Sequence, residues 1–244
     1  MNSPTTQTSK DSQDLSSPRH RQFIGVAGAL LPVLVLALDR IRETDGLTGA
    51  DLRSVSAYYY TGAVVVFVGT LIALSIFLFM YEGYRNEWRR QDRVTALIAG
   101  TAAALVALFP TSPPKPGFRL SWWTVPQGYL HYAAAALLLA CFAYYCLVLF
   151  RKPAPGGPAL TRAQNARNFL YAGCGITILA SMVWAAIAGA LKQSIFFPEA
   201  LALEAFALSW LVKGRVNRTA VATVRAVRHP VQSVKGVWKA MAEQ

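Results

Sequence analysis

The chain has 244 residues, of which 54% are hydrophobic and only 15% are charged, and its formal net charge is +12. Soluble domains carry about 25% charged residues, so this composition argues against a soluble protein and favours a membrane protein with a lipid-facing surface. The basic charge would also suit a nucleic-acid partner, but its placement along the chain points to a membrane instead.

Residues 1–21 are rich in Ser, Thr, Gln and Asp and show no apolar period, which predicts a disordered cytoplasmic arm. Six apolar stretches follow, and each is long enough, or nearly so, to cross a hydrocarbon core of about 30 Å. They cover Phe23–Leu38, Tyr58–Tyr81, Val94–Phe109, Tyr129–Phe150, Phe169–Leu191 and Ile195–Val212. The first is short enough for a signal peptide, but no small-residue cleavage site follows it. We therefore expect an all-α polytopic bundle of six transmembrane helices over residues 22–214.

Lys and Arg gather in alternate gaps between these stretches. Of the 24 Lys and Arg residues, 18 lie in the arm, in the gaps after the second and fourth stretches, and in the tail. The other gaps hold six. Because cytoplasmic segments carry such an excess of basic residues, the pattern predicts a multi-pass protein of the cytoplasmic membrane with both termini in the cytoplasm.

Residues 215–244 form a basic tail in which apolar residues recur at helical spacing, with a break at His229-Pro230. This predicts two short amphipathic helices that lie on anionic inner-leaflet lipids. An unstructured tail that only enforces topology is the alternative. Stacking aromatics are not interleaved with the cations, so no nucleic-acid partner is expected. The residues expected at the membrane surface are Arg218, Arg225, Arg228, Lys235 and Lys239.

Two glutamates lie in the last apolar stretch. Glu204 is about 14 Å into it at helical rise, where an unpaired carboxylate costs about 2.5 kcal/mol or more. Glu199 follows Pro198 at the start of the helix, where the helix dipole favours an anion. The two side chains are separated by about 140° around the helix, so they need not share a face.

Other polar residues fall in the same external half under this topology. They are His131, Ser54, Ser56, Tyr58, Tyr60 and Asp39. Together with the two glutamates, they predict a polar pocket that binds a lipid headgroup or a small polar ligand. Purely structural roles stay open for His131 and Glu199. A lone His usually only forms a hydrogen bond, and a carboxylate at the start of a helix is stabilised by the helix dipole.

Two other classes of function stay open. His131, Asp39 and a glutamate could hold a divalent metal in a membrane-embedded hydrolase. However, the chain lacks the HxxxH pair that alkaline ceramidases carry late in the bundle, so a non-catalytic function is favoured and no cofactor or metal is expected. Alternatively, the chain is a scaffold or assembly subunit whose arm and tail contact a membrane-protein partner.

Small residues within the apolar stretches predict close helix packing, as in Gly25 and Gly28 or Gly173 and Gly175. The three cysteines, Cys141, Cys146 and Cys174, also fall inside these stretches, where they would pack as small apolar residues.

Several fragments carry a resemblance to a known group. They include Ser54–Thr61, Phe79–Tyr84, Ala107–Thr111, Ser209–Gly214 and Glu199. With these fragments the chain resembles uncharacterised bacterial six-span membrane proteins of the DUF998 and Frag1/DRAM-like groups, over about residues 22–214. The resemblance implies a six-helix membrane fold and no established reaction.

Overall fold

The computed structural model describes residues 18–41, 46–83, 87–152 and 162–228, with side chains described up to Arg215. Within these ranges the protein is helical and contains no strand. The six long helices are α1 (Pro18–Ile41), α2 (Val64–Phe79), α3 (Arg89–Leu108), α4 (Val125–Leu147), α5 (Arg162–Ala190) and α6 (Phe196–Arg228). Two short 3-10 helices accompany them, η1 (Val55–Tyr60) and η2 (Leu149–Arg151).

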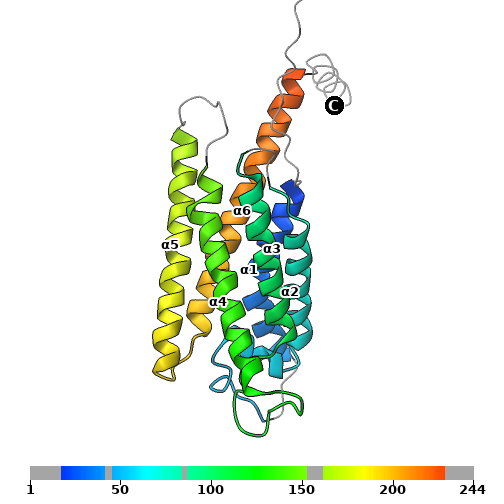
Figure 1. The fold of residues 1–244 in the computed structure, drawn as a ribbon, viewed down its shortest axis with the longest axis vertical. Coiled ribbons are helices and arrows are strands. Elements are labelled where there is room, and N and C mark those ends of the chain that lie inside the picture. Colours follow the sequence, from blue (N-terminus) through cyan, green and yellow to red (C-terminus); the bar gives the residue numbers. More distant parts are fainter. Residues whose placement is uncertain (1–17, 42–45, 84–86, 153–161, 229–244) are drawn as a thin grey trace, which may run out of the picture.

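The helices run alternately up and down and form a closed ring in chain order. Each packs against its neighbour in the sequence, and α6 packs against α1 to close the ring. The start of α1 and the end of α6 lie at the same end of the bundle, together with the end of α2, the start of α3, the end of α4 and the start of α5 (Figure 1). The opposite end holds η1, the α3–α4 connection and the α5–α6 turn (Figure 1).

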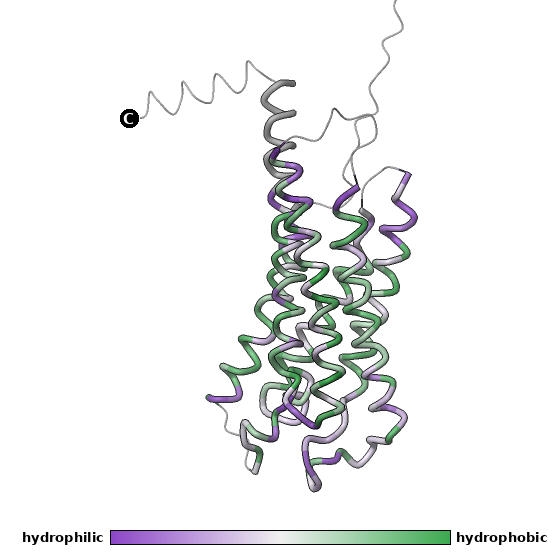
Figure 2. Tube along the Cα trace, turned by 90° about the vertical axis from the view of Figure 1, so that its left-hand side faces the viewer, coloured by the Kyte–Doolittle hydropathy of each residue, from purple (hydrophilic) through white to green (hydrophobic). Residues whose placement is uncertain are grey.

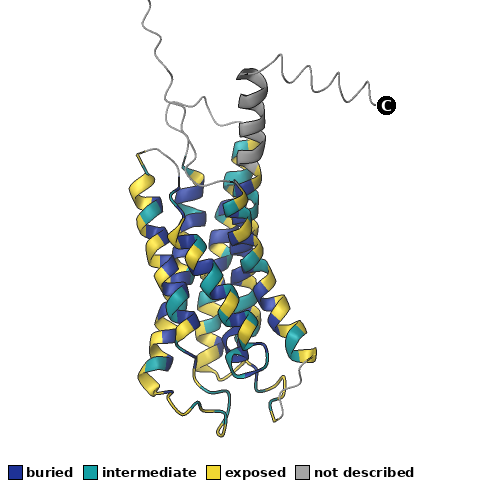
Figure 3. Ribbon diagram, turned by 90° about the vertical axis from the view of Figure 1, so that its right-hand side faces the viewer, coloured by how far each residue is buried: buried dark blue, intermediate teal, exposed yellow. Residues whose placement is uncertain are grey.

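The outer surface has the character of a membrane protein. Four helices, α1, α3, α4 and α5, are long and apolar enough to cross a membrane, and α2 is an apolar helix of 16 residues. Large apolar side chains are exposed on the outside of the bundle, such as Val33 (55%), Val65 (69%) and Phe169 (82%). The middle of the bundle is apolar and its ends are polar (Figure 2), while exposed positions follow the outer sides of the helices (Figure 3). The prediction of a helical membrane protein is thereby confirmed.

Glycines on α1 allow the ring to close. A Cβ on Gly25 would lie 2.8 Å from Leu211 Cγ and 3.0 Å from the Ala207 carbonyl oxygen of α6. A Cβ on Gly28 would lie 2.9 Å from the Phe206 ring. Because these distances are shorter than van der Waals contact, only glycine lets α1 and α6 approach this closely.

An aromatic cluster fills the core near the end of the bundle where α1 starts. Trp210 is fully buried, and its ring lies 5.1–5.2 Å from the rings of Tyr81, Tyr145 and Phe150. Arg21 is also fully buried, with its guanidinium 5.5 Å from the centre of the Tyr81 ring. A cation over an aromatic face is a favourable arrangement, so Arg21 belongs to the core.

Element boundaries differ from the sequence prediction at both ends of the chain. Residues 18–21 belong to α1 and not to the arm, because Arg21 packs in the core; residues 1–17 lie outside the described residues. α6 continues without a break to Arg228, so the boundary expected after residue 214 falls within a helix that projects past its neighbours (Figure 1). Arg218, Arg225 and Arg228 lie on this extension, whereas Lys235 and Lys239 lie outside the described residues.

The second apolar stretch is also divided. We predicted one helix over Tyr58–Tyr81, but the chain forms η1 first and enters α2 only at Val64. The interruption lies at Thr61, whose backbone is extended at the end of η1. The cause is a set of polar contacts around η1.

Candidate functional site

The segment Ser54–Thr61 caps itself at both ends. Ser54 Oγ accepts a hydrogen bond at 2.9 Å from the Ala57 N–H, which also donates to the Ser54 carbonyl at 3.1 Å. At the other end, Thr61 Oγ1 donates to the Tyr58 carbonyl at 3.0 Å. These two hydroxyls are therefore engaged in fixing the turn.

Glu199 caps η1 from a distant part of the chain. Its Oε2 accepts a hydrogen bond from the Val55 N–H at 2.7 Å, and the carboxylate also interacts with the Ser56 N–H. A carboxylate is favoured here because the first amides of a helix have no partner within it. Glu199 thus joins the first turn of α6 to η1.

The α5–α6 turn is fastened to Arg53, which lies two residues before η1. The Arg53 carbonyl accepts hydrogen bonds from Ile195 N (2.7 Å) and Ser194 Oγ (3.1 Å). The Arg53 guanidinium in turn donates to the Lys192 carbonyl at 2.7 Å. Together with the Glu199 cap, these contacts bind the 53–60 segment and the start of α6 into one unit.

His131 and Tyr60 serve the other side of this end of the bundle. Pro110 stops α3, which leaves carbonyl groups at its end without helical partners. Three side chains from separate elements donate to successive carbonyls there: His131 Nδ1 to Phe109 (2.6 Å), Trp123 Nε1 to Pro110 (3.3 Å) and Tyr60 OH to Thr111 (2.6 Å). Because a carbonyl only accepts, the His131 ring is protonated at Nδ1. We infer that His131, which is 1% exposed, holds the end of α3.

Seven of the eight predicted ligand-binding residues lie at this end of the bundle. Tyr58 is buried, its ring lies 6.0 Å from the Phe196 ring, and it is close enough to Asp39 to interact electrostatically. Ser56 is buried beside the amides that Glu199 caps. The described polar contacts of Glu199, Ser54, Tyr60 and His131 go to backbone groups of the protein itself. The arrangement builds a closed cap, and a ligand at this end stays a prediction.

Glu204 is the exception, since it lies on the outer face of α6. It is exposed, in line with Phe197, Leu201 and Leu208, which are 45–70% exposed. At helical rise it lies about 12 Å from the first residue of α6. Among the described residues its carboxylate has no hydrogen-bond or ion-pair partner. The structure therefore separates the two glutamates into a cap and an outward-facing group.

The outer face of α5 carries a pattern that the sequence analysis missed. Two series of residues are exposed on this face, each with a spacing of seven residues. The small residues are Ala166, Gly173 and Ala180, and the large apolar residues are Phe169, Ile176 and Val183. Ile187 and Ala190 are also exposed, towards the end of the helix. A Cβ on Gly173 would meet nothing within 4 Å, although the same atom on Gly175 would lie 2.5 Å from Leu147 Cγ. Gly175 therefore packs inside the bundle, whereas Gly173 faces outward. The seven-residue spacing was the signal that could have revealed this face.

No metal-binding set is evident within the part of the chain that the structure describes, where no three His, Cys, Asp or Glu side chains are grouped to hold an ion. Cys141, Cys146 and Cys174 are buried as free thiols. Comparisons with protein-family models, with curated proteins and with solved structures found no match. Membership of the DUF998 or Frag1/DRAM-like groups thus stays a prediction.

Proposed function

We propose that the chain crosses the bacterial cytoplasmic membrane six times with both termini in the cytoplasm, and that it serves as an assembly subunit for another membrane protein. The antiparallel ring, with α1 starting where α6 ends, supports an even number of spans. The alternate placement of Lys and Arg supports the orientation. α2 and the apolar first half of α6 would be the two spans beyond α1, α3, α4 and α5.

The orientation can be tested with two single substitutions at opposite ends of the bundle, Lys152→Cys and Lys192→Cys. The native cysteines are buried, so they give little background. In intact cells, a membrane-impermeant thiol reagent should label only the Lys192→Cys variant. Labelling of the Lys152→Cys variant alone would reverse the orientation.

The exposed carboxylate of Glu204 carries the proposal of an assembly subunit. In the proposed topology it faces hydrocarbon, where an ionised side chain costs about 2.5 kcal/mol or more. Inside membranes such groups pair with one another or face the interior of a bundle. Since the described part of this chain offers Glu204 no partner, a second protein that covers it would remove this cost.

The neighbouring face of α5 supports a helix as the covering element. Close approach of two transmembrane helices needs small residues, and Ala166, Gly173 and Ala180 are exposed seven residues apart. A seven-residue repeat is the spacing that keeps a seam facing a second helix over several turns. The partner would be a transmembrane helix that brings a basic side chain to the depth of Glu204.

The test compares complexes extracted from the native membrane in mild detergent, with mass measured for the intact assembly. Glu204→Gln and Gly173→Leu should each release a partner chain of different mass. Gly69→Leu is the control, since Gly69 is also exposed and a Cβ there would meet nothing within 4 Å, but it lies on α2. Equal loss in the control, a complex insensitive to both variants, or an assembly of this chain alone would overturn the proposal.

A further inference from the structure

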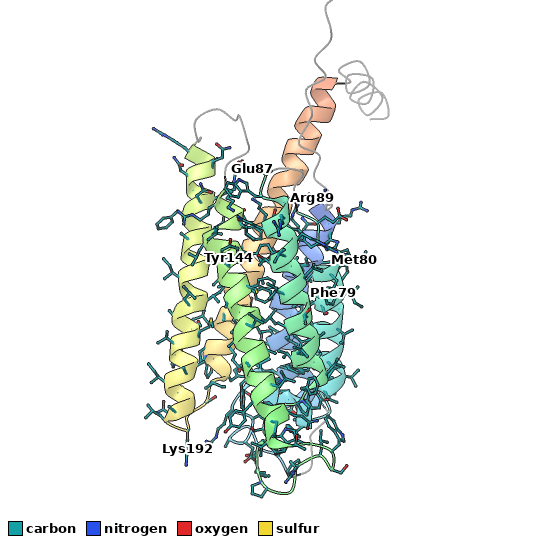
Figure 4. All side chains as sticks on the ribbon, viewed as in Figure 1. Phe79, Met80, Glu87, Arg89, Tyr144 and Lys192 are labelled. Atoms are coloured by element: carbon teal, nitrogen blue, oxygen red, sulfur yellow. The ribbon has the colours of Figure 1, made fainter. Side chains whose placement is uncertain are left out.

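A groove lies at the end of the bundle where α1 starts and α6 ends, between the end of α2 and the start of α3. Its volume is about 470 Å³, within the range of small-molecule sites. Glu87 and Arg89 lie at this end, opposite Lys192 (Figure 4). The lining residues are Glu82, Glu87, Arg89, Arg90, Arg93 and Val94. The groove plays no part in the assembly function proposed above.

Two of the arginines hold the walls of the groove. Arg93 Nη1 donates to the carbonyls of Phe79 and Tyr81, with a distance of 3.1 Å to the latter. Arg89 Nη2 lies 3.4 Å from Glu82 Oε2, and both side chains are about half exposed. These contacts join the start of α3 to the end of α2.

Arg90 and Glu87 are available to a ligand. Both are exposed, and no hydrogen bond or ion pair ties either of them to the rest of the described chain. Among the described residues, the groove therefore offers its contents the Arg90 guanidinium and the Glu87 carboxylate. A ligand that matches both must carry an anionic group and a cationic group a short distance apart.

The groove also continues into the apolar outer surface. Val94, Leu97 and Ile98 follow Arg90 by four, seven and eight residues, which places them on the same face of α3. They are 46%, 37% and 41% exposed. Beside the groove, Met80 at the end of α2 is 62% exposed. A ligand with a polar head and an apolar body could thus rest its head among the charges and its body on α3.

We propose that the groove binds a glycerophospholipid whose headgroup carries a phosphate and a primary ammonium. Arg90, with Arg89 beside it, would bind the phosphate, because a guanidinium matches phosphate oxygens in a bidentate manner. Glu87 would accept the ammonium. The acyl chains would lie along Val94 and Ile98. A lipid without the ammonium would leave the Glu87 carboxylate without a partner in the groove.

The proposal is tested on the full-length protein in detergent by mass measurement of retained lipid. The probes are phosphatidylethanolamine, phosphatidylglycerol, free phosphoethanolamine and inorganic phosphate. Phosphatidylethanolamine should be retained most strongly by the natural protein. Arg90→Gln should weaken its binding about tenfold or more, as expected for the loss of a hydrogen bond between charged groups.

A second variant separates the two parts of the headgroup. Glu87→Gln should weaken phosphatidylethanolamine and leave phosphatidylglycerol unchanged or tighter. Lys192→Gln, at the opposite end of the bundle, should change neither, and the thermal unfolding of each variant checks that it is folded. Preference of the natural protein for phosphatidylglycerol, equal binding of inorganic phosphate, or full retention by a folded Arg90→Gln variant would overturn the proposal.

Discussion

Replacement of Glu199 tests whether this residue holds the end of the bundle together. Glu199→Ala removes the carboxylate that accepts from the Val55 N–H at 2.7 Å and interacts with the Ser56 N–H, while both of those residues stay buried. A hydrogen bond to a charged group is worth about 1.5–3 kcal/mol, and a buried amide left without an acceptor adds its own cost. We therefore expect the free energy of unfolding to fall by about 3 kcal/mol.

The assay is thermal unfolding of purified protein in detergent. For a chain of this size, 1 kcal/mol corresponds to about 2–4 °C in Tm, so Glu199→Ala should lower Tm by about 6–12 °C. Glu204→Ala is the matched control in the same helix, and it should not lower Tm, because the Glu204 side chain is exposed and has no hydrogen-bond or ion-pair partner among the described residues. Equal Tm shifts for the two variants would refute the assignment of Glu199 as a cap.

Three further predictions concern packing, the end of α3 and pH. Gly175→Ala should lower the free energy of unfolding by about 1 kcal/mol or more, since its Cβ would lie 2.5 Å from the Leu147 side chain. Gly173→Ala, which faces open space, should raise the free energy of unfolding by up to about 1 kcal/mol. If both variants changed the free energy of unfolding in the same direction, the packing described for the two glycines would be wrong. His131→Phe should cost about 1–3 kcal/mol in the same unfolding assay, because a carbonyl loses its donor, and an unchanged Tm would show that the ring only fills space. Hydrogen bonds from the Thr48 N–H and hydroxyl hold the pKa of Asp51 below its ordinary value of 3.8. The ionised carboxylate therefore stabilises the Thr48–Asp51 turn fully above pH 3.8, and this stabilisation is lost as the pH falls through the lowered pKa. Hydrogen exchange of the loop amides should report this loss, and Asp51→Asn should abolish its dependence on pH.

The apolar stretches predicted the positions of the helices well, since burial in lipid needs only length and hydropathy. The exception is the segment before α2, where Tyr58, Tyr59 and Tyr60 are apolar enough to extend a span. Their helix is ended by Thr61 and capped by Glu199, which lies more than 130 residues away in the chain. A contact of that separation leaves no local signal in the sequence.

The different roles of Glu199 and Glu204 become clear only when it is known which side of α6 faces the bundle. Helix geometry places Glu199 and Glu204 about 140° apart, but it does not say which of them faces inward. That choice is made where α1 meets α6, because Gly25 and Gly28 accept Leu211 and Phe206 at close distance. With these residues turned toward α1, Glu199 reaches η1 and Glu204 faces outward.

The closed ring restricts where this protein can act on another molecule. Every long helix has a neighbour on each side, and at the end that holds η1 the described contacts of Glu199, Tyr60 and His131 go to backbone groups. The proposed partner would approach from the lipid, where α5 offers its heptad face and α6 its carboxylate, and the proposed lipid would bind in the groove at Arg90, where α3 starts. These two surfaces are separate, so loss of the partner in Glu204→Gln and loss of the lipid in Arg90→Gln should occur independently. If either variant abolished both, the two sites would be coupled through the ring, and a rigid bundle with two unconnected surfaces would be the wrong description.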